Sequence, residues 1–77
     1  MILEVLGTGC TKCKLLHQAV FQAVADSGVT AEVRKIEDIA AIMQRGVLST
    51  PALVKDGKVL FAGKVPSPKE IAALLTA

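Results

Sequence analysis

The 77-residue sequence predicts one α/β domain, in which three helices pack on a four-stranded mixed sheet in the chain order βαβαββα. Apolar runs of strand length alternate with segments whose apolar residues recur at helical spacing. Glycine, proline and Asp-Gly turns separate these segments. A chain this short buries only about 60% of its unfolded surface, so it forms a single domain without room for a separate cofactor-binding domain.

The chain begins with an apolar run, residues 2–6, which Gly7-Thr8-Gly9 ends, and this predicts a buried strand followed by a loop. From Cys10 onward apolar residues recur three and four positions apart, which is typical of a helix packed on a sheet. The expected buried face comprises Cys13, Leu16, Val20, Ala23 and Val24. Ser27-Gly28 is expected to end this helix.

A second strand is predicted over residues 30–36, at an edge of the sheet, because about half of its side chains are polar. A short helix should follow, since two acidic residues precede it where a helix N-terminus favours negative charge. Its expected buried face comprises Ile39, Ile42 and Met43. Arg45-Gly46 is expected to end it.

Two apolar runs flank Asp56-Gly57, a pair typical of tight hairpins because both central residues need positive φ. The two runs are Ala52-Leu53-Val54 and Val59-Leu60-Phe61. Ser67 should cap the last helix, because Pro68 follows at the first helical position and Glu70 stands three residues after the cap. The expected apolar face of this helix comprises Ile71, Leu74 and Leu75.

Pairing rules bring three loops to one edge of this sheet. The strand-helix-strand unit at the start makes two parallel strands with a right-handed crossover. If the third strand runs antiparallel to the first, its start at Pro51 lies beside the end of the first strand. The end of the fourth strand, at Gly63 and Lys64, reaches the same edge. The three loops are therefore expected to converge around Cys10 and Cys13.

Composition excludes several classes of protein. A chain that is 52% hydrophobic with a net charge of +2 is not disordered, and charges interrupt every apolar run before the roughly 20 residues that span a bilayer. With 3% aromatic residues and no basic stripe, we expect no nucleic acid among its partners. The first six residues lack the pattern of a secretory signal, so we expect a cytoplasmic protein that does not engage membranes.

Cys10 and Cys13 are the candidates for special chemistry. Two cysteines at this spacing cannot staple a small secreted domain, but at a helix start their sulfurs come within bonding reach. Helix N–H groups and the positive end of the dipole should lower the pKa of Cys10 below its free value of about 8.5, and Lys12 and Lys14 add positive charge. Cys10 is then the nucleophile toward a disulfide, and Cys13 resolves the mixed disulfide.

Residues 7–13, residues 49–53 and Gly63 together resemble the thioredoxin superfamily, in particular its small glutaredoxin-like and redox-active disulfide members. The resemblance covers essentially the whole chain and implies a thioredoxin-like fold. It also implies a cis peptide bond before Pro51, which would face the cysteines. By the same resemblance, the backbone of Thr50 and the turn at Gly63 bind an extended substrate segment.

The sequence departs from the family between and around the cysteines. Thr11 and Lys12 replace the usual proline and aromatic residues and are expected to modulate the reduction potential. The turn after Gly63 lacks an acidic residue of the kind with which glutaredoxins bind glutathione. Glu4 stands six residues before Cys10, where thioredoxins keep a buried carboxylate. It either accepts the proton of the second cysteine or is a solvated side chain.

These observations favour a thiol-disulfide oxidoreductase that cycles Cys10 and Cys13 between dithiol and disulfide, without a metal or any other cofactor. We expect a monomer that acts on client proteins with disulfides and receives electrons from an upstream reductase. The alternative is a binding module or chaperone for copper or zinc that uses the same cysteine pair. His17 would then be a third ligand, whereas otherwise it is a surface residue.

Overall fold

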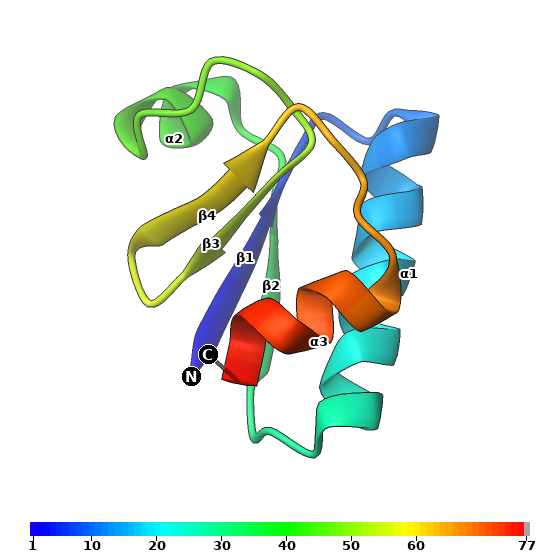
Figure 1. Ribbon diagram of the computed structural model, residues 1–77. Coiled ribbons are helices and arrows are strands. Elements are labelled where there is room, and N and C mark those ends of the chain that lie inside the picture. The colour runs from blue at the N-terminus through cyan, green and yellow to red at the C-terminus, as the bar shows by residue number, and fades with distance from the viewer. Residues whose placement is uncertain (77) are drawn as a thin grey trace.

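The computed structural model describes residues 1–76 and has the predicted element order (Figure 1). The elements are β1 (Ile2–Leu6), α1 (Thr11–Ser27), β2 (Glu32–Ile36), α2 (Ile39–Gln44), β3 (Ala52–Lys55), β4 (Lys58–Ala62) and α3 (Pro68–Thr76). No helix within these 76 residues is both long and apolar enough to cross a bilayer.

The four strands form one mixed sheet in the spatial order β2-β1-β3-β4. β1 is parallel to β2 and antiparallel to β3, and β3 pairs antiparallel with β4. The predicted topology is thereby confirmed, including the position of β2 at an edge. β2 begins at Glu32, two residues later than the apolar pattern indicated.

Helices cover both faces of the sheet: α1 and α3 lie on one face and α2 lies on the other (Figure 1). Side chains alternate along β1, so that Leu3 and Val5 pack into the core under α1 and α3. Leu6 packs into the second core, under α2. The side chain of Glu4, between Leu3 and Val5, therefore belongs to the α2 face.

Local signals end the elements where the sequence predicted. Asp56 and Gly57 have φ of 47° and 85°, which is the geometry of a tight hairpin. Gly28 caps α1 in the left-handed conformation with φ of 72°. Asp38 accepts a hydrogen bond from the N–H of Ala41 at 3.0 Å and caps α2. These contacts fix where the loops leave the helices.

The predicted buried face of α2 was wrong for two of its three residues. Ile42 is 4% exposed, whereas Ile39 and Met43 are 63% and 60% exposed. Because α2 has six residues, less than two turns, only one side chain of its apolar set reaches the sheet, where Val47 completes the contact. Leu74 of α3 is also more exposed than predicted, at 38%.

The hairpin turn closes on the beginning of the chain. The N–H of Ile2 donates to Oδ1 of Asp56 at 2.7 Å, and the N–H of Asp56 donates to the carbonyl of Ile2 at 2.8 Å. β1 begins and α3 ends on this side of the molecule (Figure 1). The loop that carries Cys10 lies at the opposite end of the sheet, after the last residue of β1.

Candidate functional site

The site is built where three neighbouring strands share a last rung. Leu6 pairs with Ala52, and Ala52 pairs with Ala62. The chain beyond this rung consists of the loop from Gly7 to Cys10, the segment that ends at Pro51, and the turn at Gly63. The pairing of β1, β3 and β4 therefore brings these three loops to one edge of the sheet, as predicted.

Cys10 is the N-cap of α1 and uses its own sulfur as the capping group. Its backbone is extended, with φ of −69° and ψ of 168°, and its Sγ accepts a hydrogen bond from the N–H of Cys13 at 3.3 Å. The carbonyl of Cys10 accepts the first helical bond, from the N–H of Lys14 at 3.0 Å. The side chain is exposed, so a partner's disulfide can reach the sulfur.

Cys13 lies one turn further along α1 and is 3% exposed. Its burial raises the pKa of its thiol, because a thiolate is poorly solvated there, and the hydrogen bond that this thiol donates to Cys10 raises it further. Cys13 is therefore held protonated beside the exposed sulfur. Both cysteines are free thiols in this structure.

The pKa of Cys10 is lowered, whereas that of Cys13 is raised. The hydrogen bond from the thiol of Cys13 is the largest cause, and the backbone N–H groups of Cys13 and Lys12 add to it. Hydrogen bonds to a thiolate favour the charged form, so Cys10 ionises more readily than Cys13. The arrangement suits an attack by Cys10 and a later attack by Cys13.

Thr11 and Lys12, the predicted modulators, are exposed residues in the first turn of α1. Lys12 affects the pKa of Cys10 through its backbone N–H. The expected effect of these two residues on the reduction potential stays a prediction.

The segment before β3 is fixed against the turn after β4. The Thr50-Pro51 peptide bond is cis. The carbonyl of the buried Pro51 accepts a hydrogen bond from the N–H of Gly63 at 2.8 Å. Gly63 has φ of 76°, and a Cβ there would lie 3.2 Å from the Cβ of Ser49. Thr50 is exposed next to Pro51. That its backbone binds a client segment stays a prediction.

Glu4 has a partner that the sequence did not indicate. Nε of Arg45 donates to Oε1 of Glu4 at 2.8 Å, and Nη2 donates to Oε2 at 2.6 Å. The side chain of Glu4 is only 13% exposed, so the interpretation as a solvated carboxylate was wrong. Arg45 lies 41 residues away in sequence, and no local pattern connects the two positions. Glu4 as proton acceptor for Cys13 stays a prediction.

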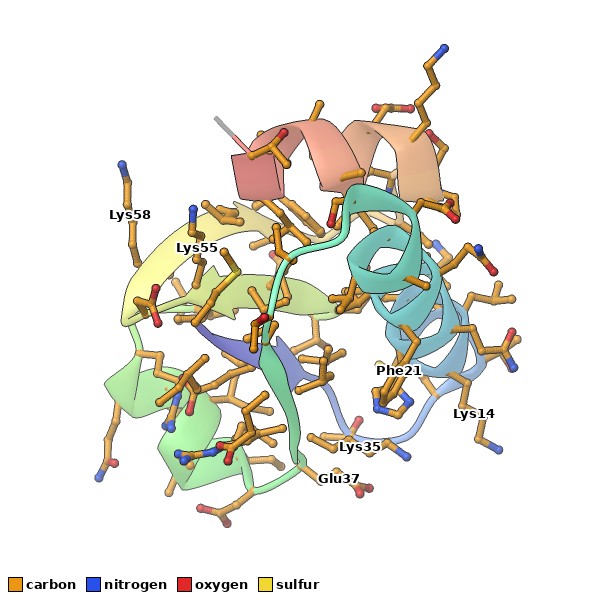
Figure 2. All side chains as sticks on the ribbon, turned by 90° about the horizontal axis from the view of Figure 1, so that it is seen from below. Lys14, Phe21, Lys35, Glu37, Lys55 and Lys58 are labelled. Carbon is orange, nitrogen blue, oxygen red and sulfur yellow. The ribbon has the colours of Figure 1, made fainter. Side chains whose placement is uncertain are left out.

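His17 packs edge-on against Phe21, with ring centroids 4.8 Å apart and ring planes at 89°. Figure 2 labels Phe21 beside the ribbon of α1. Among residues 1–76, no group of three or more His, Cys, Asp or Glu side chains is arranged to hold a metal ion. The cysteine pair of the metal alternative therefore has no third ligand of these types in the described chain.

A cavity of about 460 Å³ lies away from the cysteines. Its lining comprises Lys55, Asp56, Lys58, Leu60 and Leu74. Lys55 and Lys58 face each other across the hairpin register, and Figure 2 shows both extending from that hairpin. This cavity is at the turn end of β3 and β4, opposite the end where Cys10 is exposed.

Comparisons with known proteins agree with this geometry. A family model described as "Thioredoxin domain" matches residues 1–76. A protein named thioredoxin from Methanothermobacter thermautotrophicus is 34% identical over 76 residues, which cover 99% of each chain. A protein named thioredoxin from Methanocaldococcus jannaschii is 37% identical over 71 residues, which cover 92% of this chain and 81% of the relative.

Proposed function

The chain belongs to the thioredoxin family, and from this premise we propose that it is a thiol-disulfide oxidoreductase that reduces disulfides of client proteins. The observation that carries the proposal is the geometry of the two thiols: Cys10 is exposed at the N-cap of α1, and its Sγ accepts from the N–H of Cys13, which is 3% exposed. The pKa of exposed Cys10 is lowered and that of buried Cys13 is raised, through one hydrogen-bonded pair.

The proposed reaction moves two electrons in two exchange steps. The thiolate of Cys10 attacks one sulfur of the client disulfide; a mixed disulfide forms, and the other client sulfur leaves as a thiolate. Cys13 then loses its proton to solvent or to that leaving thiolate and attacks Sγ of Cys10. The second client sulfur is released, and the protein is left with a Cys10–Cys13 disulfide. The client gains the two electrons that the dithiol loses.

The cysteine pair is itself the redox group in this proposal, so no other cofactor or metal is required. An upstream reductase returns two electrons to the disulfide. A cytoplasmic location fits the reducing direction, because that compartment keeps most thiols reduced. The protein acts as a monomer, and an extended client segment would pair beside Thr50 and the turn at Gly63.

A redox titration tests the proposal directly. The protein is equilibrated in dithiothreitol buffers of graded potential, and free thiols are counted after an acid quench. We expect one reversible two-electron transition. In parallel, the reduced protein is incubated with Zn(II) or Cu(I) and passed through gel filtration, with Cys10→Ser/Cys13→Ser as the control. A retained ion together with a pair that does not cycle would support the metal alternative instead.

The assignment of roles has its own test in trapping. Cys13→Ser keeps the attacking thiol but removes the resolving one, so it should accumulate mixed disulfides with a model client such as oxidised insulin. Cys10→Ser should accumulate none. Trapping by Cys10→Ser alone would reverse the two roles.

A further inference from the structure

We infer that Gly7 is a positioning residue for the resolving thiol: the missing side chain at this residue provides the space in which Sγ of Cys13 lies. The inference rests on the proposed function for its redox meaning, but its geometry is independent of that function. Gly7 touches no client sulfur and would act only through Cys13.

The space is filled by the cysteine itself. A Cβ placed on Gly7 would lie 2.4 Å from Sγ of Cys13 and 2.9 Å from its Cβ. Both distances are below any normal contact between such atoms, so no residue other than glycine fits without a displacement. The other close atom is Cα of Cys13, at an ordinary 3.9 Å.

Backbone freedom does not explain this glycine. The glycines with positive φ are Gly9, Gly28, Gly46, Gly57 and Gly63, and Gly7 is not among them. The φ angle of Gly7 does not require glycine, so the obstacle to an alanine there is the overlap of its Cβ with the sulfur of Cys13.

Hydrogen bonds hold the backbone of both residues in place, so the side chain of Cys13 is the part that can move. Gly7 is buried, and its N–H donates to the carbonyl of Ile36 at 3.0 Å, which extends the pairing of β1 with β2 by one bond. Cys13 is held in the first turn of α1 by its N–H bond to Cys10. A side chain at residue 7 would therefore displace the sulfur of Cys13 rather than the strand.

The position of that sulfur matters to both thiols. At its present depth Cys13 is shielded from water and donates to the sulfur of Cys10. A displaced sulfur would be better solvated and would donate less well. Gly7→Ala should then lower the pKa of Cys13 and raise the pKa of Cys10, so that the difference between the two pKa values becomes smaller.

Alkylation kinetics measure the first of these effects. In a Cys10→Ser background Cys13 is the remaining thiol, and its rate with iodoacetamide is followed from pH 6 to 10 with and without Gly7→Ala. Each unit of decrease in its pKa raises the thiolate fraction at neutral pH about tenfold and moves the midpoint of the rate–pH profile down by the same unit. Val20→Ala, a core substitution in the same helix, is the control that loosens α1 without touching Cys13. Equal pH profiles for Gly7→Ala and its parent would overturn the inference.

A double-mutant cycle tests the contact without any redox readout. Gly7→Ala is measured by chemical unfolding in the native chain and in Cys13→Gly, which removes Sγ and Cβ, the two atoms that a Cβ at residue 7 would overlap. We expect the substitution to destabilise the native chain and to be neutral or stabilising beside Gly at residue 13, where it only restricts the unfolded chain. If Gly7→Ala alone does not fold, restored folding in the double variant supports the inference.

The outcomes separate the inference from the proposed function. An equal cost of Gly7→Ala in both backgrounds, or no restored folding, overturns the role of Gly7. Suppose instead that the wild-type protein shows no reversible redox transition in dithiothreitol buffers, while Gly7→Ala destabilises the native chain but not the Cys13→Gly variant. That result overturns the proposed function and leaves the packing of Gly7 against Cys13 in place.

Discussion

Arg45 holds the carboxylate of Glu4 through two hydrogen bonds, of 2.8 Å from Nε and 2.6 Å from Nη2. Its remaining nitrogen, Nη1, donates to the carbonyl of Ala41 at 2.8 Å. The guanidinium therefore joins the last turn of α2 to the middle of β1. It also fixes the start of the loop that leads to Thr50.

This ion pair predicts how stability depends on acid. The hydrogen bond from Arg45 is the largest cause that lowers the pKa of Glu4 in the folded protein. A lowered pKa contributes stability above the unfolded value of about 4.3, and this contribution is lost as pH falls through the folded value. Glu4→Gln should therefore cost about 1 to 2 kcal/mol at pH 7 and much less at pH 3. Urea unfolding of both proteins at pH 7 and pH 3 measures the loss in free energy of unfolding. An equal loss at the two pH values would contradict a stabilising ion pair between Glu4 and Arg45.

The hydrogen bond between the two thiols predicts a difference between two substitutions of Cys13. Cys13→Ala removes the donor that most lowers the pKa of Cys10, so this pKa should rise toward about 8.5. Cys13→Ser keeps an O–H donor and should raise it less. Thiolate absorbance near 240 nm against pH measures both variants. Identical curves would mean that the Cys13 side chain does not stabilise the thiolate.

The turn at Gly63 predicts an effect on client reduction. Gly63→Ala forces a side chain into positive φ and against Ser49, which should disturb the segment at Pro51. We expect KM for an oxidised client to rise while the thiol titration of Cys10 stays unchanged. Gly57→Ala is the matched control, because it has the same backbone strain in open space at the far end of the hairpin. Both should destabilise by about 1 to 2 kcal/mol, and an equal rise in KM would contradict a local role.

His17 is predicted to be structural. His17→Ala removes the edge-on contact with Phe21 and should cost about 0.5 to 1.5 kcal/mol in thermal or urea unfolding. The Cys10 titration and the redox midpoint should not change. A lost ability to retain Zn(II) in this variant would instead favour His17 as a ligand.

The sequence was sufficient for the element order because each boundary carries a local signal. Asp56-Gly57 and Gly28 adopt the backbone that their residue types favour, and the Ser67 hydroxyl accepts from the N–H of Glu70 at 3.2 Å as the capping pattern predicts. Cys10 and Cys13 were found by the same kind of local pattern, since the helix start brings them together.

The remaining features depend on contacts that no local pattern encodes. The pairing of Glu4 with Arg45 arises because α2 lies on the face of β1 that carries Glu4. Ile39 has helical apolar spacing but stays exposed because α2 is too short to bury it. Gly7 follows an apolar run and was assigned to the loop, although its role is set by the sulfur packed against it.

The closure of the hairpin turn on Ile2 has a practical consequence for handling the molecule. β1 begins and α3 ends far from the exposed thiol (Figure 1). A tether, a reporter domain or an electrode linker attached through either end of the chain should leave Cys10 free. Immobilised protein should therefore exchange electrons with a dissolved disulfide as readily as the untethered chain.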